Sequence, residues 1–336
     1  MEATVTNLAR VLGQRGHVVV IAAPEGSVVP EGLAVIQIPG VLQPTAQTQD
    51  RSDLGVTESA LANLWRYAHE VQSQYDLLVN FAYDWLPFYL TPFFSVPVAH
   101  FVSMGALSDR INEAITQLSI QFPGRLGAYS QSQADTFKTV DAGAWEILGF
   151  GLDVGAYEYC DRPKDYLAWV GRISPEKGLE DAISAALLAK KPLRIFGKLE
   201  DEAYWHRLQP LIDRARQTVS VEYRGFLQTD ELQRSLGHAR ALLVTPKWTE
   251  AFGIGVVEAL ACGVPAITYK RGGPAEIITA GKTGWLVEPD DVAALAEAAG
   301  RIEQIDRREC RRWAIANYSL SAWRDRFEQW FGNIVL

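Results

Sequence analysis

The stretch "ALLVTPKWTEAFGIGVVEALACGVPAITY" (residues 241–269) decides the fold. Its first apolar run, "ALLVTP", predicts a buried strand, and "IGVVEALACG" predicts a helix that Gly263 closes, with Pro265 just beyond. The second apolar run, "AITYK", predicts another strand. A strand, a loop, a helix and a strand in this order indicate a βαβ unit of a parallel sheet that is covered on both faces.

The same alternation continues through both halves of the chain. In the second half we predict strands at "YLAWVGRI", "PLRIFG", "VSVEYRG" and "GWLVEP", and helices at "GLEDAISAALLAKK", "EAYWHRLQPLIDRAR", "TDELQRSLGHA", 290–302 and 319–331. In the first half we predict an initial helix, a proline- and glycine-rich loop at 24–40, and strands at "HVVVIAA", "DLLVNFAY", "PVAHFV", "RLGAYS" and "WEILGF". The polar stretch 153–165 predicts a linker, so we expect two doubly wound α/β domains in tandem.

Composition excludes several classes of protein. The 336 residues carry a formal net charge of −8, which argues against nucleic-acid binding because that function needs a basic surface. The three cysteines are far apart and the five histidines form no cluster, so we expect neither disulfides nor a metal site. No apolar run approaches the roughly 18 residues of a membrane span, and the N-terminus lacks a signal-peptide pattern. We therefore expect a cytoplasmic protein without strong membrane association.

Ligands of doubly wound sheets bind beyond the carboxyl ends of the strands, so the loops there are the candidate sites. After the strand "YLAWVGRI", Gly171 permits a turn, and Arg172 and Lys177 flank a helix that begins near Gly178. A guanidinium, an ammonium and the free amides of a helix N-terminus favour an anion such as a diphosphate. The alternative is that both cations are solvated surface charges.

The loop in "TEAFGIGVVEALACGVPAI" (249–267) places two carboxylates around a glycine turn. Gly253 and Gly255 lack a Cβ, so a ligand can approach the backbone amides there. Glu250 precedes the helix and Glu258 lies about one turn inside it, so one acid can face a sugar while the other accepts from two vicinal hydroxyls. The alternative makes Glu250 a helix cap and Glu258 a solvated helix residue. The run is not a dinucleotide fingerprint, because Glu258 replaces its final glycine.

A third loop, "KRGGPAEIITAGKTGWLVEPDD" (270–291), opens another short helix, with Gly272 and Gly273 before Pro274 at the first helical position. It adds a third set of backbone amides at the same edge of the sheet. Three such loops in one domain favour a site for phosphate and hydroxyl groups.

These segments, in this order, resemble the donor-domain signature of the retaining glycosyltransferases of family 4. The resemblance runs over about residues 169–291, and "GHVVVIAAP", "AYSQSQADTF", "ILGFGLDVGAY" and "YSLSAWRDRFEQWF" extend it more weakly. It implies the GT-B fold, an α/β architecture of two Rossmann-like doubly wound domains facing a central cleft. The expected parts are an acceptor-binding domain 1–153, a linker 154–165, a donor-binding domain 166–316, and a helix 317–336 that packs back on the first domain.

The resemblance also implies roles for individual residues. Arg172 and Lys177 would hold the donor diphosphate. Glu250 would lie beside the transferred sugar, and Glu258 would bind the ribose hydroxyls. The other implied donor contacts are the turn at Gly171, the backbone of Phe252, Gly253 and Ile254 at sugar and phosphate, and Phe226 and Leu227 against the nucleobase.

Two features depart from the family pattern. The family opens with a strand and a Gly-Gly-x-Glu loop, which we expect to be missing before residue 1, with Glu2 as the remaining glutamate. Where the family often has a histidine beside the sugar, after "PVAHFV", this sequence has Ser103. Serine does not titrate near neutral pH, so a role assigned to that histidine does not transfer.

The predicted acceptor side is aromatic. The rings of "NFAYDWLPFYLTPFF" (80–94) suit a flat acceptor or a sugar face, and core packing is the alternative for each ring. Together with "PVAHFVSMGALS" and "TPKWTEAFG", this segment resembles glucosyltransferases that transfer glucose from UDP-glucose to tetrahydrobiopterin. The helix candidate "DRINEAITQLSIQFPGR" has as many acids as bases, which favours a soluble acceptor. The acceptor-side candidates are Asn80, Tyr83, Asp84, Trp85 and Ser103.

The resemblance thus implies a retaining glycosyltransferase that moves a hexose from a UDP-sugar to a small soluble acceptor. We expect no cofactor besides this donor substrate, and the lack of an Asp-x-Asp motif argues against a metal-clamped mechanism. Two alternatives remain open, a non-catalytic nucleotide-sugar-binding protein and a nucleotide-sugar epimerase of the same fold. The oligomeric state is not predicted.

Overall fold

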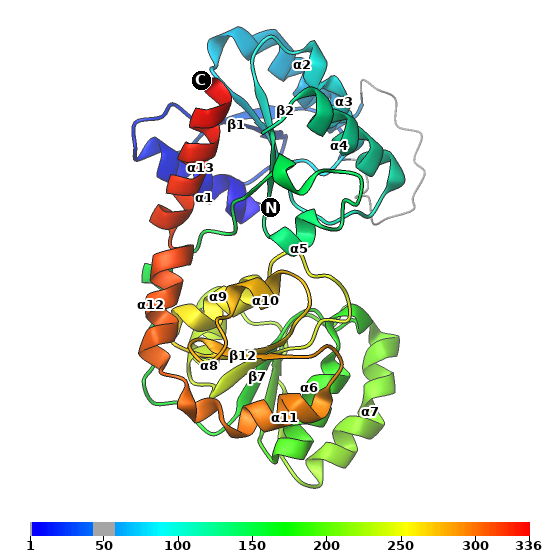
Figure 1. The fold of residues 1–336 in the computed structure, drawn as a ribbon, viewed down its shortest axis with the longest axis vertical. Coiled ribbons are helices and arrows are strands. Elements are labelled where there is room, and N and C mark those ends of the chain that lie inside the picture. Colours follow the sequence, from blue (N-terminus) through cyan, green and yellow to red (C-terminus); the bar gives the residue numbers. More distant parts are fainter. Residues whose placement is uncertain (1, 43–57) are drawn as a thin grey trace. The chain divides into compact units, whose positions relative to one another are not determined.

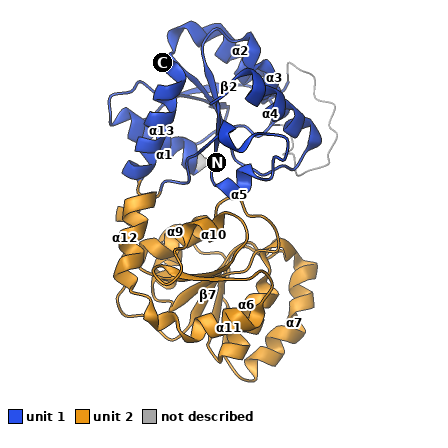
Figure 2. Ribbon diagram, viewed as in Figure 1, with its two compact units in different colours: residues 1–151, 320–336 blue, residues 152–319 orange. Residues whose placement is uncertain are grey.

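The computed structural model describes residues 2–42 and 58–336 and divides the chain into two compact units (Figure 2). Unit 1 contains residues 1–151 and 320–336, and unit 2 contains residues 152–319. The chain therefore passes from one unit to the other twice, and its last helix belongs to the first unit (Figure 1).

Unit 2 contains one sheet of six parallel strands in the order β12-β11-β10-β7-β8-β9. The strands are β7 (Leu167–Val170), β8 (Leu193–Phe196), β9 (Val221–Tyr223), β10 (Ala241–Val244), β11 (Ala266–Tyr269) and β12 (Gly284–Val287). Each lies within an apolar run that the sequence predicts to be a strand. Most of their side chains are buried, as expected for a parallel sheet between two layers of helices.

Helices cover both faces of this sheet (Figure 1). They are α6 (Leu179–Ala189), α7 (Glu202–Arg216), α8 (Thr229–Gly237), α9 (Ile254–Ala261), α10 (Gly273–Ile277), α11 (Val292–Gly300) and α12 (Arg307–Tyr318). One group, α6 with α7 and α11, packs together, and α9 packs with α8, α10 and α12. The helix α12 was not predicted from the sequence; five of its twelve residues are charged, and only Cys310 and Ala314 are buried.

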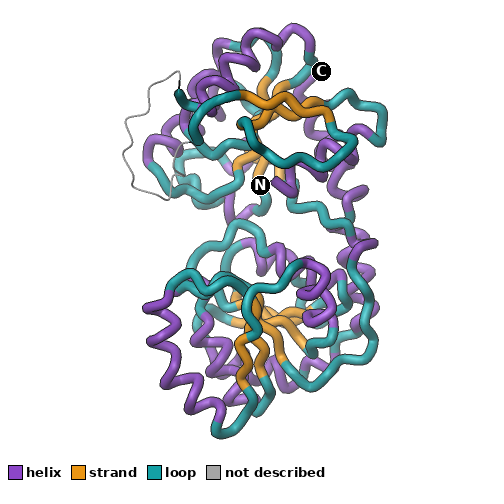
Figure 3. The backbone as a smooth tube through the Cα atoms, turned by 180° about the vertical axis from the view of Figure 1, so that it is seen from behind, coloured by secondary structure: helices purple, strands orange, loops and turns teal. Residues whose placement is uncertain are grey.

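Unit 1 is also an α/β unit of parallel strands, which Figure 3 shows from behind. A four-stranded sheet has the order β3 (Leu78–Asn80), β4 (Val98–Val102), β5 (Leu126–Ala128) and β6 (Trp145–Ile147), and β1 (Val20–Pro24) pairs with β2 (Ala34–Ile38). The predicted loop at 24–40 is therefore partly wrong, because the short apolar run "AVIQI" inside it forms β2. The helices are α1 (Glu2–Gly13), α2 (Ala60–Val71), α3 (Trp85–Leu90), α4 (Asp109–Gln121), α5 (Gln131–Ala134) and α13 (Leu320–Val335).

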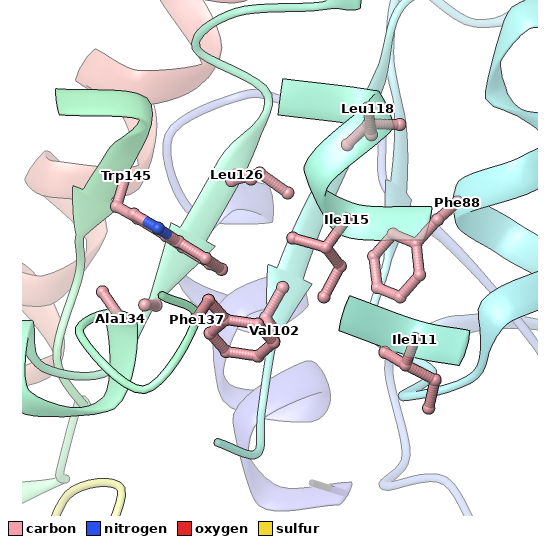
Figure 4. Packing of buried hydrophobic residues seen from close by; sticks show 10 residues of the cluster. Phe88, Val102, Ile111, Ile115, Leu118, Leu126, Ala134, Phe137 and Trp145 are labelled. Atoms are coloured by element: carbon pink, nitrogen blue, oxygen red, sulfur yellow. The ribbon is translucent and has the colours of Figure 1, made fainter. Parts of the chain in front are cut away.

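The core of unit 1 has two parts. Figure 4 shows the first, a cluster formed by Phe88, Val102, Ile111, Ile115, Leu118, Leu126, Ala128, Ala134, Phe137 and Trp145. The second is supplied by α13, which contacts α1 and buries Trp323, Phe327 and Trp330. The indole of Trp323 donates to the carbonyl of Gly149 at 3.1 Å, so α13 is an integral part of this unit.

Candidate functional site

The strand order of unit 2 creates a topological crossover between β7 and β10. From β7 the chain continues outward through β8 and β9, and it then adds β10 on the other side of β7. The loops after β7 and β10 therefore leave adjacent strand ends and lead to α6 and α9, in the two separate helix groups. Ligands of doubly wound sheets bind at this point. Two of the three loops that the sequence marks as candidate sites, those after β7 and β10, lie there.

Backbone contacts join these two loops. Gly178 has φ 63°, and a Cβ there would lie 2.1 Å from the carbonyl oxygen of Thr245, so the position requires glycine. The Thr245 hydroxyl donates to the carbonyl of Gly178 at 2.8 Å and accepts from the Trp169 indole at 3.2 Å. The Lys247 amide donates to the carbonyl of Glu176 at 2.8 Å. The two loops are thereby held in a fixed relation.

Lys177 and Glu250, one from each loop, form a bidentate ion pair. The Lys177 ammonium donates to both carboxylate oxygens of Glu250, at 2.7 Å each. The indole N–H of Trp248 donates to Glu250 Oε2 at 3.3 Å, and its ring lies 5.5 Å from the ammonium. The side chains of Lys177 and Glu250 are 17% and 21% exposed. Glu250 therefore does not cap α9, whose N-cap residue is Gly253.

Arg172 lies at the start of the first loop, with a side chain that is 44% exposed. Its guanidinium pairs with Glu176 at 3.2 Å and with Glu200 at 3.1 Å. Ion pairs between exposed groups are weak and exchange readily, so the guanidinium can turn to another anion. Arg172 and Lys177 thus share a loop but are paired with different acids.

The loop after β11 packs backbone to backbone on the loop that carries Glu250. The Gly273 amide donates to the carbonyl of Glu250 at 2.8 Å, and a Cβ on Gly272 (φ 69°) would lie 2.6 Å from the Glu250 backbone. A Cβ on Gly253 (φ 108°) would lie 2.8 Å from Pro274. Pro274 is the second residue of α10 rather than the predicted first, because the helix begins at Gly273. Only glycine permits these approaches.

The start of α9 combines a buried anchor with accessible backbone. Phe252 is buried and its ring lies 5.9 Å from that of Tyr318. Ile254 is exposed, and a Cβ on Gly255 would meet no heavy atom within 4 Å. The backbone there borders open space, and the first amides of a helix have no intrahelical acceptor. This terminus can therefore donate to an anion or a hydroxyl.

Glu258, on the second turn of α9, is partly buried and hydrogen-bonded. The Tyr157 hydroxyl donates to its Oε1 at 2.9 Å. Burial raises the pKa of the Glu258 carboxyl, and the bond from Tyr157 opposes that rise. The interpretation of Glu258 as a solvated residue is therefore wrong. Tyr157 was not predicted as a site residue, because it lies 101 residues from Glu258 in the segment predicted to be a linker.

A pocket lies beside β9, where the family resemblance implies the nucleobase. Its volume is about 540 Å³, and it is lined by Tyr223, Arg224, Leu227, Glu231, Arg234 and Ser235. Phe226, next to Leu227 in the chain, is exposed. Gly171 directly follows β7, and its amide donates to the carbonyl of Phe196 at the end of β8 at 3.0 Å. Of the residues predicted here, Leu227 lines the pocket.

Asn80 is part of a buried hydrogen-bond chain in unit 1. Its amide nitrogen lies 3.2 Å from His100 Nδ1, and His100 Nε2 lies 2.8 Å from the Thr91 hydroxyl. Burial lowers the pKa of His100 to about 3, so the imidazole is neutral and accepts at Nδ1 while it donates at Nε2. Asn80 also bonds the backbone of Ala82 at both side-chain atoms. Asn80 thus braces the loop after β3.

The other acceptor-side candidates lie after the neighbouring strands β3 and β4. The Tyr83 hydroxyl donates to the carbonyl of Gly105 at 2.6 Å, and Asp84 caps α3. Trp85 packs against the core cluster of Figure 4, and Ser103 is partly buried. The structure therefore gives Tyr83 and Asp84 local partners, which the aromatic pattern did not predict.

Within residues 2–42 and 58–336, no group of three or more His, Cys, Asp or Glu side chains is arranged to hold a metal ion. In the same part of the chain no helix is both long and apolar enough to span a membrane. The side chain of Glu2, the predicted remnant of the first family loop, lies outside the description.

Comparison with known proteins identifies a domain in unit 2 and several relatives. Residues 161–319 match the family Glycosyl transferases group 1. The chain is 29% identical to sucrose synthase from Solanum tuberosum over 135 residues, covering 38% of this chain and 16% of that protein. It is 28% identical to glycogen synthase from Mycobacterium tuberculosis over 247 residues, covering 65% and 58%. The matches thus span less than two thirds of these curated relatives.

Solved structures match over almost the whole chain. Anabaena Alr3699/HepE, in complex with UDP and glucose, superposes with a TM-score of 0.74 at 17% identity, covering 99% of this chain and 95% of that one. Sucrose-phosphate synthase from Thermosynechococcus elongatus superposes with a TM-score of 0.74 at 18% identity, covering 98% and 92%. The predicted fold class is confirmed: the chain has the GT-B fold with parallel sheets in both units.

Proposed function

We propose that this GT-B chain, with its glycosyl transferases group 1 domain, is a retaining glycosyltransferase that moves glucose from UDP-glucose to a small soluble acceptor. One observation carries the proposal, the contact of Lys177 and Glu250 at the crossover of β7 and β10, in loops that also contain the start of α9. This arrangement supplies a cation, a carboxylate and free backbone amides. A sugar linked to a diphosphate needs these three kinds of group.

The proposed reaction separates the sugar from the diphosphate. The bond between the anomeric carbon and the β-phosphate oxygen breaks, and its electron pair leaves with the diphosphate. Lys177, Arg172 and the amides at the start of α9 stabilise the charge that develops there. The acceptor hydroxyl attacks from the same face and passes its proton to a donor phosphate oxygen, so configuration is retained. The resemblance to family 4 implies this proton path and implies that Glu250 positions the sugar.

The remaining donor contacts follow the same assignment. Glu258 accepts from the ribose hydroxyls, and the backbone of 252–254 contacts sugar and phosphate. Phe226 and Leu227 lie against the nucleobase, an assignment that the pocket beside β9 supports because Leu227 lines it. UDP and glucose are the ligands of the Anabaena Alr3699/HepE structure, which favours the same donor here.

We propose tetrahydrobiopterin as the acceptor. Three segments of the chain are similar to the cyanobacterial UDP-glucose:tetrahydrobiopterin glucosyltransferase, and a pterin is a flat molecule that aromatic rings can stack on. The rings of Tyr83 and Trp85 and the hydroxyl of Ser103 lie near the carboxyl ends of β3 and β4 and are suited to this contact. The amide of Asn80 and the carboxylate of Asp84 serve the protein's own backbone instead.

Incubation with UDP-glucose and tetrahydrobiopterin tests the proposal. We expect release of UDP together with a glucosylated pterin whose anomeric proton shows the α configuration of the donor by NMR. Isomerisation of the sugar without an acceptor would identify an epimerase. Binding of UDP-glucose without turnover would identify a non-catalytic binding protein. Product of inverted configuration would contradict the retaining mechanism.

A pair of lysine variants connects the activity to the site. Lys177→Gln is expected to lose most UDP affinity and all transfer. Lys191→Gln is the matched control, because Lys191 is also ion-paired within unit 2, to Asp165 at 3.2 Å, but lies outside the proposed site. Equal affinities for UDP in the two variants would remove the diphosphate role from Lys177.

A further inference from the structure

Tyr157 lies in the segment predicted to be a linker, yet it is only 7% exposed, and both its hydroxyl and its carbonyl are bonded to other parts of unit 2. Its hydroxyl donates to Glu258 Oε1 at 2.9 Å. Its carbonyl oxygen accepts from the Arg311 guanidinium at 2.6 Å, and the same guanidinium donates to the carbonyl of Ala261 at the end of α9. The segment is thus tied, side chain and backbone, to the helix that carries Glu258.

The bond from Tyr157 has two consequences for Glu258. The terminal torsion of a glutamate is soft, so a bond to Oε1 restricts an orientation that would otherwise vary. It leaves Oε2 available to accept from another group. Donation to the carboxylate also favours its ionised form and so opposes the effect of burial on the Glu258 pKa. An ionised carboxylate is the form that accepts from two neighbouring hydroxyls.

We propose that Tyr157 is a positioning residue that holds the Glu258 carboxylate toward the vicinal hydroxyls of the donor ribose. The inference rests on the proposed function, which assigns the ribose to Glu258. A role limited to packing between the linker and α9 would affect stability, but it would not change how the protein recognises those hydroxyls.

Other ionisable side chains occur on the elements around α9. They include Asp153 in the linker, Cys262 directly after α9, Asp230, Glu231 and Arg234 on α8, Glu276 on α10, and Arg307, Arg308, Glu309, Cys310, Arg311, Arg312 and Tyr318 on α12. Burial, Glu258, Cys262 and Asp153 all raise the pKa of Tyr157, so its phenol stays protonated and remains the donor near neutral pH. Arg311 bonds the Tyr157 carbonyl. Removal of the phenol hydroxyl therefore removes a defined bond to Glu258 and leaves the arginine contacts in place.

The test compares two ligands, UDP and 2′,3′-dideoxy-UDP, which lacks both ribose hydroxyls and keeps both phosphates. Calorimetric titration gives the ratio of their Kd values between about pH 5 and about pH 8, and ionisation of the phosphates cancels in this ratio. The proteins are the wild type, Tyr157→Phe and Tyr159→Phe. The last is the matched control, because it removes a phenol hydroxyl two residues along the same segment.

We expect the wild type to prefer UDP, and this preference to fall as the pH drops through the pKa of Glu258. Tyr157→Phe is expected to lower the preference about tenfold, the size of a hydrogen bond to a charged acceptor. It should also move the midpoint to higher pH, because the carboxylate loses a bond that favours its charged form. Tyr159→Phe should follow the wild type.

Two results would overturn the role of Tyr157. One is a Tyr157→Phe protein with an unchanged ratio and midpoint, and the other is an equal loss of affinity for both ligands. The variant Glu258→Gln shows whether such a result contradicts only the role of Tyr157 or the proposed function as well. A wild type that binds neither ligand contradicts the function itself. A preference that disappears in Glu258→Gln but persists in Tyr157→Phe contradicts only the inference, and thermal melting verifies that each variant is folded.

Discussion

Glu250→Gln is expected to bind UDP more tightly than the wild type while losing transfer. Both oxygens of Glu250 lie 2.7 Å from the Lys177 ammonium. A phosphate that contacts the other side of that ammonium comes within about 5 Å of the carboxylate. Two unit charges at this separation repel by roughly 3 kcal/mol at an effective dielectric constant of about 20.

Solvent reduces this repulsion, because the side chain of Glu250 is 21% exposed. If solvent leaves about half of this repulsion energy, its removal in the variant corresponds to about a tenfold gain in UDP affinity. Under the proposed function, loss of transfer is expected because a neutral amide would not accept from the sugar hydroxyls as a carboxylate does.

Isothermal titration with UDP at low and high salt measures the gain. The gain in UDP affinity should become smaller as ionic strength rises, since salt screens the repulsion that the variant removes. Glu200→Gln is the control, because Glu200 pairs with Arg172 but is 43% exposed, and we expect less than about a twofold change. Unchanged or weaker UDP binding by Glu250→Gln would refute the reasoning, since the carboxylate would then not compete with the diphosphate for Lys177.

Three further outcomes concern stability and are measured by urea unfolding. Gly178→Ala is expected to lower the free energy of unfolding by more than about 3 kcal/mol, because the residue has a left-handed conformation and the new Cβ would clash with backbone. Gly255→Ala is the control: a Cβ there meets open space, so the loss should be less than about 1 kcal/mol. The pKa of His100 is about 3 in the folded protein and 6.5 in the unfolded chain, so its contribution to the free energy of unfolding is fully present above pH 6.5. That contribution falls as the pH drops, by roughly 2 kcal/mol at about pH 5. His100→Phe should flatten this pH dependence. Trp323→Ala, which empties a fully buried site, is expected to cost roughly 3–5 kcal/mol, and a loss under 1 kcal/mol would contradict the importance of α13 to unit 1.

Much of the fold could be predicted from continuous apolar runs, because strands that are buried on both faces contain few polar residues. All six strands of unit 2 lie in such runs. The exceptions have physical reasons. The strand β2 follows Gly32, precedes Pro39, and carries partly exposed residues, so its composition is that of a loop. The helix α12 has five charged residues among its twelve and buries only two, so its apolar residues are too few to mark it as a helix.

The sequence predicts the parts of the candidate site that depend on close approach of the backbone. It does not predict which side chains pair with one another. Gly253 and the Gly272–Gly273 pair follow from the need for close backbone approach, and the sequence shows them. The pairing of Lys177 with Glu250 joins positions 73 residues apart, and the bond of Tyr157 joins positions 101 apart. Such contacts depend on distances that only the folded chain sets.

The double passage of the chain between the units has a consequence for biosynthesis. On the ribosome, residues 152–319 are complete before α13 exists, so the second unit can mature while the first still lacks the rings of Trp323, Phe327 and Trp330. Translation ordinarily lets the N-terminal domain finish first. Here the N-terminal half is made first but lacks part of its apolar interior until α13 has been synthesised, so we expect unit 1 to complete its core only at the end of translation.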